Sequence, residues 1–366
     1  MMRWKSFGLA AGTAAAFTFL TAADATRAVS LLFEKEAREV APGRSPKFLT
    51  RGAQGLLLLS AAPGADGKGQ DLFLRSSSDG GDTFSEAMRV NQTPGEVSDG
   101  GENSAVLAAA PDHSYLYAVW MARDPRTPMA GLIRFARSAG MSPSFSPALT
   151  INDDSLSTTH SYQTLGVAPD GAIYVAWLDG RETAHSHHGP GHAPIMTLFL
   201  ARSTDKGRTF GKNIRVAGNI CPCCRPSIAF LDGKVFLAWR SVESGDIRDM
   251  FTAFSSDQGQ TWSQPVLVAR DGWKLNGCPH VGPAMAALGG KLHVAWYTEG
   301  GADPGVYLAA SEDAGRSFRG KRKVSGATLD PTHPQLAAAE DKLALVFQAR
   351  SGDREQGRGR VGVYYR

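Results

Sequence analysis

Short runs of alternating apolar and polar residues recur along the whole chain, and turns rich in Gly, Asp and Ser separate them. Alternation with a period of two is typical of β-strands that bury one face. Six of these runs end near an aromatic residue, and they cover 55–60, 115–120, 173–177, 235–239, 292–296 and 343–347. This recurrence predicts an array of similar all-β units.

An eight-residue phrase, Ser-x-Asp-x-Gly-x-x-aromatic, follows one strand in most of these units. It occurs at 77–84, 203–210, 255–262 and 311–318, and a degenerate copy covers 138–145. Ser and Asp side chains can hydrogen-bond nearby backbone N–H groups, glycine permits a positive φ, and the aromatic ring can pack back onto the sheet. We therefore expect the phrase to fix a turn between two strands and to take no part in catalysis.

These phrases resemble the Asp-box, or BNR repeat, of the sialidase superfamily. The resemblance implies a six-bladed β-propeller built from four-stranded sheets. The chain ends at Arg366, where a sixth phrase would begin, so we expect strands from both chain ends to close the last blade. The segment 33–40 is the expected N-terminal contributor. Residues 26–366 then form a single domain.

The first 25 residues have a different character from the rest of the chain. Arg3 and Lys5 precede an apolar run from 7 to 23, and Ala23-Asp24-Ala25 fits a cleavage signal. We predict a secretory signal peptide over residues 1–25, with export to the periplasm or the medium and no membrane span after cleavage. An uncleaved anchor is the alternative interpretation. Removal of two cations and one carboxylate lowers the net charge from +4 to +3, which does not indicate a nucleic-acid partner.

Propeller topology sorts the loops onto two faces. The loops that enter the innermost strands, and those that follow the second strands, lie on one face, which we call the ligand face; the repeated turns lie on the other. All four cysteines fall in two ligand-face loops, 219–226 and 271–280. Thiolates and imidazoles suit copper or zinc. The predicted metal ligands are Cys221, Cys223, Cys224, Cys278, His280 and His333.

Other interpretations of these cysteines stay open. An exported protein with an even number of cysteines commonly forms disulfides, and a bridge from Cys223 or Cys224 to Cys278 would join two blades. A redox-active dithiol is the third interpretation. The His-rich segment 184–194 is either part of the ligand face or a solvated loop that binds metals only loosely.

Arginines also recur on the ligand face. They are Arg123, Arg181, Arg240 and Arg350 after the second strands, with Arg44 and Arg225 at the entries to inner strands. Guanidinium groups bind carboxylates, phosphates and sulfates. We expect Arg44, Arg225 and Arg240 to bind a small anionic or sugar ligand, with Trp273 as a wall of the pocket. Ordinary ion pairs with neighbouring acidic residues are the alternative.

The sialidase resemblance implies a glycosidase site that this chain matches only in part. Arg44 and Arg225 stand at two positions of an arginine clamp, Asp66 or Asp71 could be the acid, and Glu182 could assist a tyrosine nucleophile. However, Cys278-Pro279-His280 occupies the place of the third clamp arginine, and Thr332-His333-Pro334 the place of the tyrosine. Without that tyrosine the retaining mechanism lacks its nucleophile.

The sequence therefore predicts an exported sialidase-like propeller with a Cys/His metal site beside an arginine-lined channel. If the metal is catalytic, an open coordination position would activate water. An exo-sialidase-type glycoside hydrolase with a modified site is the first alternative. A disulfide-linked, non-enzymatic scaffold that binds a protein partner on the channel face is the second.

Overall fold

The computed structural model describes residues 7–8, 16–17, 44–51, 55–65, 67, 69–127, 130–138, 140, 144–182, 196–326, 329–339, 341–351 and 360–365. Every regular element within these ranges is a β-strand, as the alternating pattern predicts. The same ranges contain no helix long and apolar enough to cross a membrane.

The strands form antiparallel sheets in which chain neighbours pair with each other. The first sheet contains β3 (Arg44–Arg51), β4 (Gly55–Pro63), β5 (Gln70–Ser77) and β6 (Met88–Arg89), with β2 (Ala16–Phe17) parallel to β3. The second contains β7 (Val106–Ala109), β8 (Leu116–Arg123), β9 (Gly131–Arg137) and β10 (Leu149–Thr150). The third contains β11 (His160–Val167), β12 (Ile173–Asp179), β13 (Met196–Ser203) and β14 (Ile214–Ile220).

The second half of the chain repeats this arrangement. The fourth sheet contains β15 (Ser227–Leu231), β16 (Lys234–Arg240), β17 (Met250–Ser255) and β18 (Val266–Ala269). The fifth contains β19 (Ala284–Leu288), β20 (Lys291–Thr298), β21 (Gly305–Ser311) and β22 (Arg319–Lys323). The last contains β23 (Leu329–Ala339), β24 (Lys342–Ser351), β25 (Arg360–Tyr365) and β1 (Phe7–Gly8).

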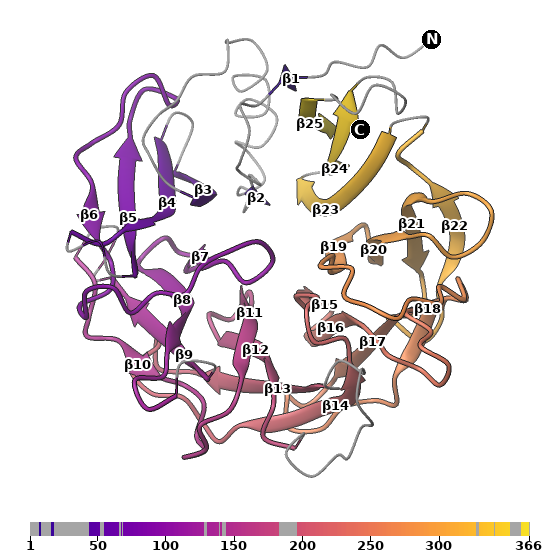
Figure 1. The fold of residues 1–366 in the computed structure, drawn as a ribbon, viewed down its shortest axis with the longest axis horizontal. Helices are drawn as coiled ribbons and strands as arrows, with labels where there is room; N and C mark the ends of the chain where they lie inside the picture. The colour runs from indigo at the N-terminus through magenta and orange to yellow at the C-terminus, as the bar shows by residue number, and fades with distance from the viewer. Residues whose placement is uncertain are drawn as a thin grey trace.

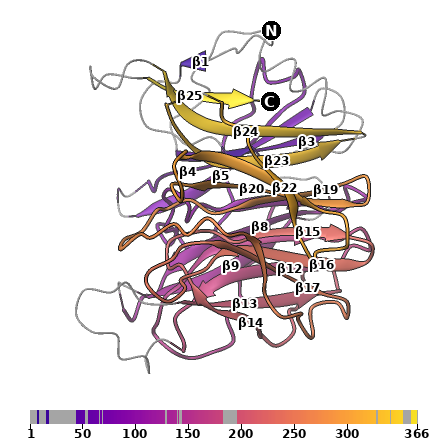
Figure 2. The ribbon, with the colours of Figure 1, turned by 90° about the vertical axis from the view of Figure 1, so that its right-hand side faces the viewer.

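The sheets are arranged around a common axis, with the first strand of each nearest the axis and the later strands further out (Figure 1). The side view puts β3–β5 and β23–β25 at the same end of the molecule (Figure 2). β1, which falls within the predicted signal peptide, pairs antiparallel with β25. The predicted contributor 33–40 lies outside the described residues. The blade count and the closure of the ring remain predictions.

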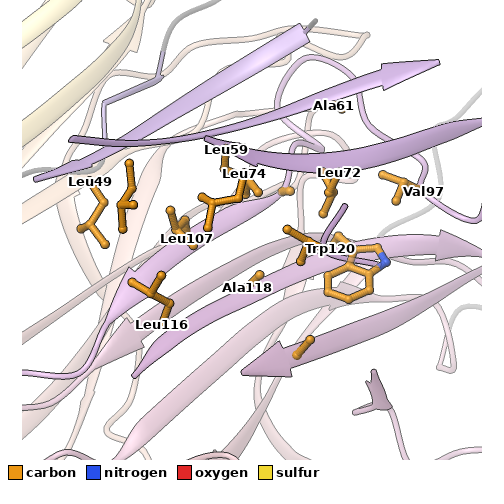
Figure 3. Packing of buried hydrophobic residues seen from close by; sticks show 14 of the residues in the cluster. Leu49, Leu59, Ala61, Leu72, Leu74, Val97, Leu107, Leu116, Ala118 and Trp120 are labelled. Atoms are coloured by element: carbon orange, nitrogen blue, oxygen red, sulfur yellow. The ribbon is translucent and has the colours of Figure 1, made fainter. Parts of the chain in front are cut away.

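The core lies between successive sheets. Leu59, Leu72 and Leu74 of the first sheet pack against Leu107 and Trp120 of the second (Figure 3). The tryptophans of four second strands, Trp120, Trp177, Trp239 and Trp296, are each at most 1% exposed. The predicted strands that end near an aromatic residue therefore carry the large side chains that fill the space between sheets, and each such ring contributes a large share of apolar burial.

The repeated phrases form turns with the same hydrogen bonds in each copy. In the first, Gly81 N donates to Ser77 Oγ at 2.8 Å, and Thr83 N donates to Asp79 Oδ1 at 2.9 Å. The copies at 203–210, 255–262 and 311–318 repeat both bonds. Gly315 has a φ of +83° and a Cβ there would lie 2.6 Å from the Phe236 ring, so only glycine fits.

Several inner strands begin with a non-glycine residue in the left-handed region. Ser45, Tyr162, His280 and His333 have φ values of 49°, 54°, 52° and 50°. Pairing in β3, β11 and β23 shifts register at this point. Such bulges redirect side chains, and the strained backbone is typical of functional positions. This conformation controls which side chains the ligand-face loops present.

Candidate metal and ligand site

Three thiol groups lie together in the loop between β14 and β15. Pro222 begins a tight turn there. Cys221 N donates to the carbonyl oxygen of Arg240, at the end of β16, at 2.9 Å, and this hydrogen bond anchors the loop to the fourth sheet. Cys221, Cys223 and Cys224 are 0%, 3% and 0% exposed. Their Sγ atoms are separated by 3.7 Å (221 to 223), 3.9 Å (223 to 224) and 3.5 Å (221 to 224).

No sulfur–sulfur bond joins these three cysteines. All four cysteines of the chain are free, and a disulfide would require a sulfur–sulfur distance of about 2.0 Å. The structure therefore brings three of the predicted metal ligands within contact of one another. It does not join Cys223 or Cys224 to Cys278, which is the bridge that would connect two blades in the disulfide interpretation.

Positive charge surrounds the thiol group. Arg248 Nη1 donates to Cys221 Sγ at 3.5 Å, and Arg248 is 3% exposed. Hydrogen bonds from the Cys223 and Cys224 thiols, with the charges of Arg240 and Arg248, lower the pKa of Cys221 strongly. The hydrogen bond to Cys221 raises the pKa of Cys223, and burial raises that of Cys224.

Cys278 and His280 approach the same group from the loop between β18 and β19. Their ligand atoms and Cys223 Sγ lie within 4.8 Å of one another. Unlike the three thiols of the first loop, both side chains are exposed. The structure thus unites five of the six predicted ligands around Cys223.

His333, the sixth predicted ligand, faces a carboxylate instead. Its Nε2 lies 3.9 Å from Glu102 Oε1. Glu102 is held in turn because its Oε2 accepts from the backbone N–H groups of Arg225 at 3.0 Å and Gly282 at 2.9 Å. His333 thus lies beside Glu102, which comes from a loop that the sequence analysis did not single out, and its role as a metal ligand stays a prediction.

The predicted anion-binding arginines differ in their surroundings. Arg240 is fully buried and donates to the carbonyl oxygens of Val281, Arg248 and Tyr297 at 2.8–3.2 Å. These bonds occupy its guanidinium with the protein's own backbone carbonyls, and its role in anion binding stays a prediction.

The two clamp arginines are placed differently from Arg240. Arg225 Nη2 donates to Ser104 Oγ at 2.7 Å, while its buried Nε has no hydrogen-bond partner among the described residues. Burial lowers the pKa of Arg225. Arg44 is exposed in β3.

The candidate catalytic carboxylates are engaged in structural contacts. Asp71 is 1% exposed, and its Oδ1 accepts from Asn91 Nδ2 at 2.8 Å and Gly95 N at 2.7 Å. Glu182 accepts from Arg215 Nε at 3.0 Å and Thr197 Oγ1 at 3.0 Å. These contacts connect loops and strands, and the catalytic roles of Asp71 and Glu182 stay predictions. Asp66 and the whole segment 184–194 lie outside the described residues.

Trp273 lines a pocket. The pocket has a volume of about 530 Å³ and is lined by Trp273, Cys278, Tyr297, Glu299, Asp330 and Arg350, among others. Trp273 is 5% exposed, meets Tyr297 edge to face and stacks on the Arg240 guanidinium at 4.8 Å. The aromatic wall and the exposed thiol of Cys278 therefore border the same space.

A second group of potential metal ligands, Asp154, His160 and Asp179, lies at the start of β11. His160 Nε2 lies 2.9 Å from Asp154 Oδ2 and 3.5 Å from Asp179 Oδ2. Arg181 pairs with both carboxylates, and His160 Nδ1 bonds the Gly131 carbonyl at 2.7 Å. Because every group in this cluster has a protein partner, we interpret it as a buried ion-pair network.

The sequence matches no protein-family model and no curated protein. Among solved structures, the chain is similar to a Penicillium chrysogenum alpha-L-arabinanase, with a TM-score of 0.55, 15% identity, and coverage of 88% of this chain and 92% of that one. It is also similar to the NanB sialidase from Streptococcus pneumoniae, with a TM-score of 0.54, 10% identity, and coverage of 88% and 68%.

Two further structures resemble the chain to the same degree. The Hadza microbial sialidase has a TM-score of 0.54 at 14% identity, and this chain spans 64% of its length. A protein of unknown function from Dyadobacter fermentans has a TM-score of 0.54, 14% identity, and coverage of 87% and 93%. At these identities the comparisons show the fold alone. The fold is that of sialidase-like propellers.

Proposed function

We propose that this protein is an exported, six-bladed sialidase-like propeller that binds copper or zinc through Cys221, Cys223 and Cys224. The observation that carries the proposal is the spacing of three buried sulfurs at 3.5–3.9 Å. A tetrahedral ion with metal–sulfur bonds of about 2.3 Å separates its sulfur ligands by about 3.8 Å. The thiols are thus preorganised for one soft ion.

The charge around the thiols supports the same proposal. Three thiolates around a monovalent or divalent ion carry a net negative charge, which is costly to bury unless cations lie close by. Arg248 and Arg240 are 3% and 0% exposed and both lower the pKa of Cys221. They supply the compensating charge.

The glycosidase alternative has weaker support from the site. His333 stands where the resemblance calls for a tyrosine, and Asp71 and Glu182 are occupied by Asn91, Gly95 and Arg215. An anionic or sugar ligand remains part of the proposal only as a neighbour of the metal. It would lie in the pocket of Trp273 and Arg350.

Metal analysis of the protein purified from the periplasm or medium, together with a free-thiol count, tests the proposal. We expect bound copper or zinc and an X-ray absorption signal of at least three sulfur neighbours at about 2.3 Å. The triple variant C221S/C223S/C224S should lose that metal, whereas the control His293→Gln, within β20, should retain it. Protein without metal and without free thiols would establish the disulfide-linked scaffold instead.

Turnover of a fluorogenic sialoside or arabinoside provides the matching test of the glycosidase alternative. We expect no turnover. Activity that Arg44→Ala abolishes, but that the triple cysteine variant retains, would reinstate a hydrolase and remove the metal from its mechanism.

A further inference from the structure

The five convergent donors exceed what one tetrahedral ion can bind, because such an ion takes four ligands. They divide into two groups of three that share one atom, Cys223 Sγ. The inner group is Cys221, Cys223 and Cys224, and the outer group is Cys223, Cys278 and His280. Within each group the ligand atoms lie within 4.8 Å of one another.

The two groups differ in access to solvent. The inner thiols are at most 3% exposed, whereas Cys278 and His280 are both exposed. Cys278 also lines the pocket of about 530 Å³ that Trp273 walls. Closed sites of several thiolates hold an ion, while a three-ligand site with an open side can exchange one.

The outer group is positioned by the fold. His280 has a φ of +52°, a strained conformation for a non-glycine residue, which the surrounding structure must enforce. Next to it, Gly282 N donates to Glu102 Oε2 at 2.9 Å, and the Val281 carbonyl accepts from Arg240. The loop that carries Cys278 and His280 is therefore tied to two other sheets.

We propose that Cys223 Sγ bridges two metal positions, and that the outer one, made with Cys278 and His280, passes its ion to the buried inner one. The proposal rests on the proposed function of the inner thiols. The thiolate of Cys223 stays bound while Cys278 and His280 are exchanged for Cys221 and Cys224. The exchange moves no electrons: an incoming thiol gives up its proton as its sulfur binds the ion, and the released Cys278 takes a proton up.

Titration of the reduced, metal-free protein with Cu(I) in the presence of a chromophoric Cu(I) chelator tests the proposal. The wild-type protein should take two equivalents. C278S/H280Q should take one, and should load it at least about tenfold more slowly, in line with the effect of lost ligand support on metal sites. C223S should retain neither ion against the chelator.

His293→Gln is the matched control, because it removes an imidazole from β20 and leaves the ligand-face loops intact. Thermal unfolding of C278S/H280Q without metal should match the wild type, since both side chains are exposed. One equivalent in the wild type, or equal stoichiometry and loading rate in C278S/H280Q, overturns the two-site proposal and leaves the inner site standing. No binding by the wild type overturns the proposed function itself.

Discussion

Lys47 shows how strongly burial can act on a single side chain of this protein. It is 3% exposed at the bulge that opens β3. Burial, reinforced by the charge of Arg225 and opposed by Asp99 and Glu102, lowers its pKa from 10.5 to about 7. In the unfolded chain the amine keeps its ordinary pKa, so folding must discharge it or bear the cost of a buried ammonium.

Lys47→Met should therefore stabilise the protein below pH 7, by up to about 4 kcal/mol. Between pH 7 and 10 the unfolded wild type binds more protons than the native wild type, so wild-type stability rises with pH and the advantage of the variant shrinks. Urea unfolding at pH 6, 8 and 9.5 measures this, with the exposed Lys342→Met as control. If the difference in the free energy of unfolding between Lys47→Met and the wild type is the same at all three pH values, the expectation is wrong.

The turns between the third and fourth strands act at the scale of elements. In the third copy, hydrogen bonds from Thr261 and Ser255 lower the pKa of Asp257 to about 2. The ionised carboxylate thus holds the turn that leads from β17 to β18. Because the native pKa is depressed, its stabilising effect is complete above the unfolded pKa of about 3.9 and is lost as the pH falls toward 2.

Asp257→Asn should lower the melting temperature at pH 7 and reduce the further loss of stability between pH 4 and 2. The amide oxygen can still accept a hydrogen bond, but it lacks the negative charge that strengthens the hydrogen bonds from Ser255 and Thr261. Melting curves across this pH range test the prediction. Asp232→Asn, in the turn between β15 and β16, is the control. It should leave the fall of the melting temperature between pH 4 and 2 unchanged.

At the scale of the whole molecule, Glu102 connects sheets that are distant in sequence. Its Oε2 accepts from backbone N–H groups that stand 123 and 180 residues further along the chain. Its Oε1 faces His333 of the last sheet. One carboxylate thus connects the loop before β7 to the loops that enter β15 and β19 and to β23 itself.

Glu102→Ala should destabilise the protein by about 2–5 kcal/mol, because two partly buried N–H groups lose their acceptor. Glu102→Gln keeps an acceptor oxygen and should cost less than half as much. Chemical denaturation measures both, with the exposed Glu312→Ala as control. Equal effects of the two variants would show that the charge, and not the acceptor, is what holds the loops.

The strands and repeated turns could be predicted because their signals are local. Alternation, a Ser-x-Asp-x-Gly phrase and a terminal tryptophan each act within a few residues. The meeting of Cys223 with Cys278 could also be predicted, since strand register alone brings two consecutive inner-strand entries onto one face. Those predictions needed no knowledge of side-chain conformation.

The sequence could not predict the contacts of side chains whose partners lie far away along the chain. Arg240 has the sequence position of a ligand-face arginine, but three carbonyls and the Trp273 ring take its guanidinium inward. Arg248 and Glu102 carry no motif, and only the packing of loops far apart in sequence brings them to Cys221 and Arg225. No short-range pattern encodes such contacts.

The left-handed residues at the inner-strand entries bear on how this protein would change under selection for heat tolerance. Glycine adopts that backbone region without steric cost, so a lineage that needed only a sturdier fold would gain by replacing His280 or His333. Such replacements would relieve the backbone strain and remove the imidazoles. Histidines retained at these positions in heat-adapted descendants would therefore indicate that the imidazole group has a function.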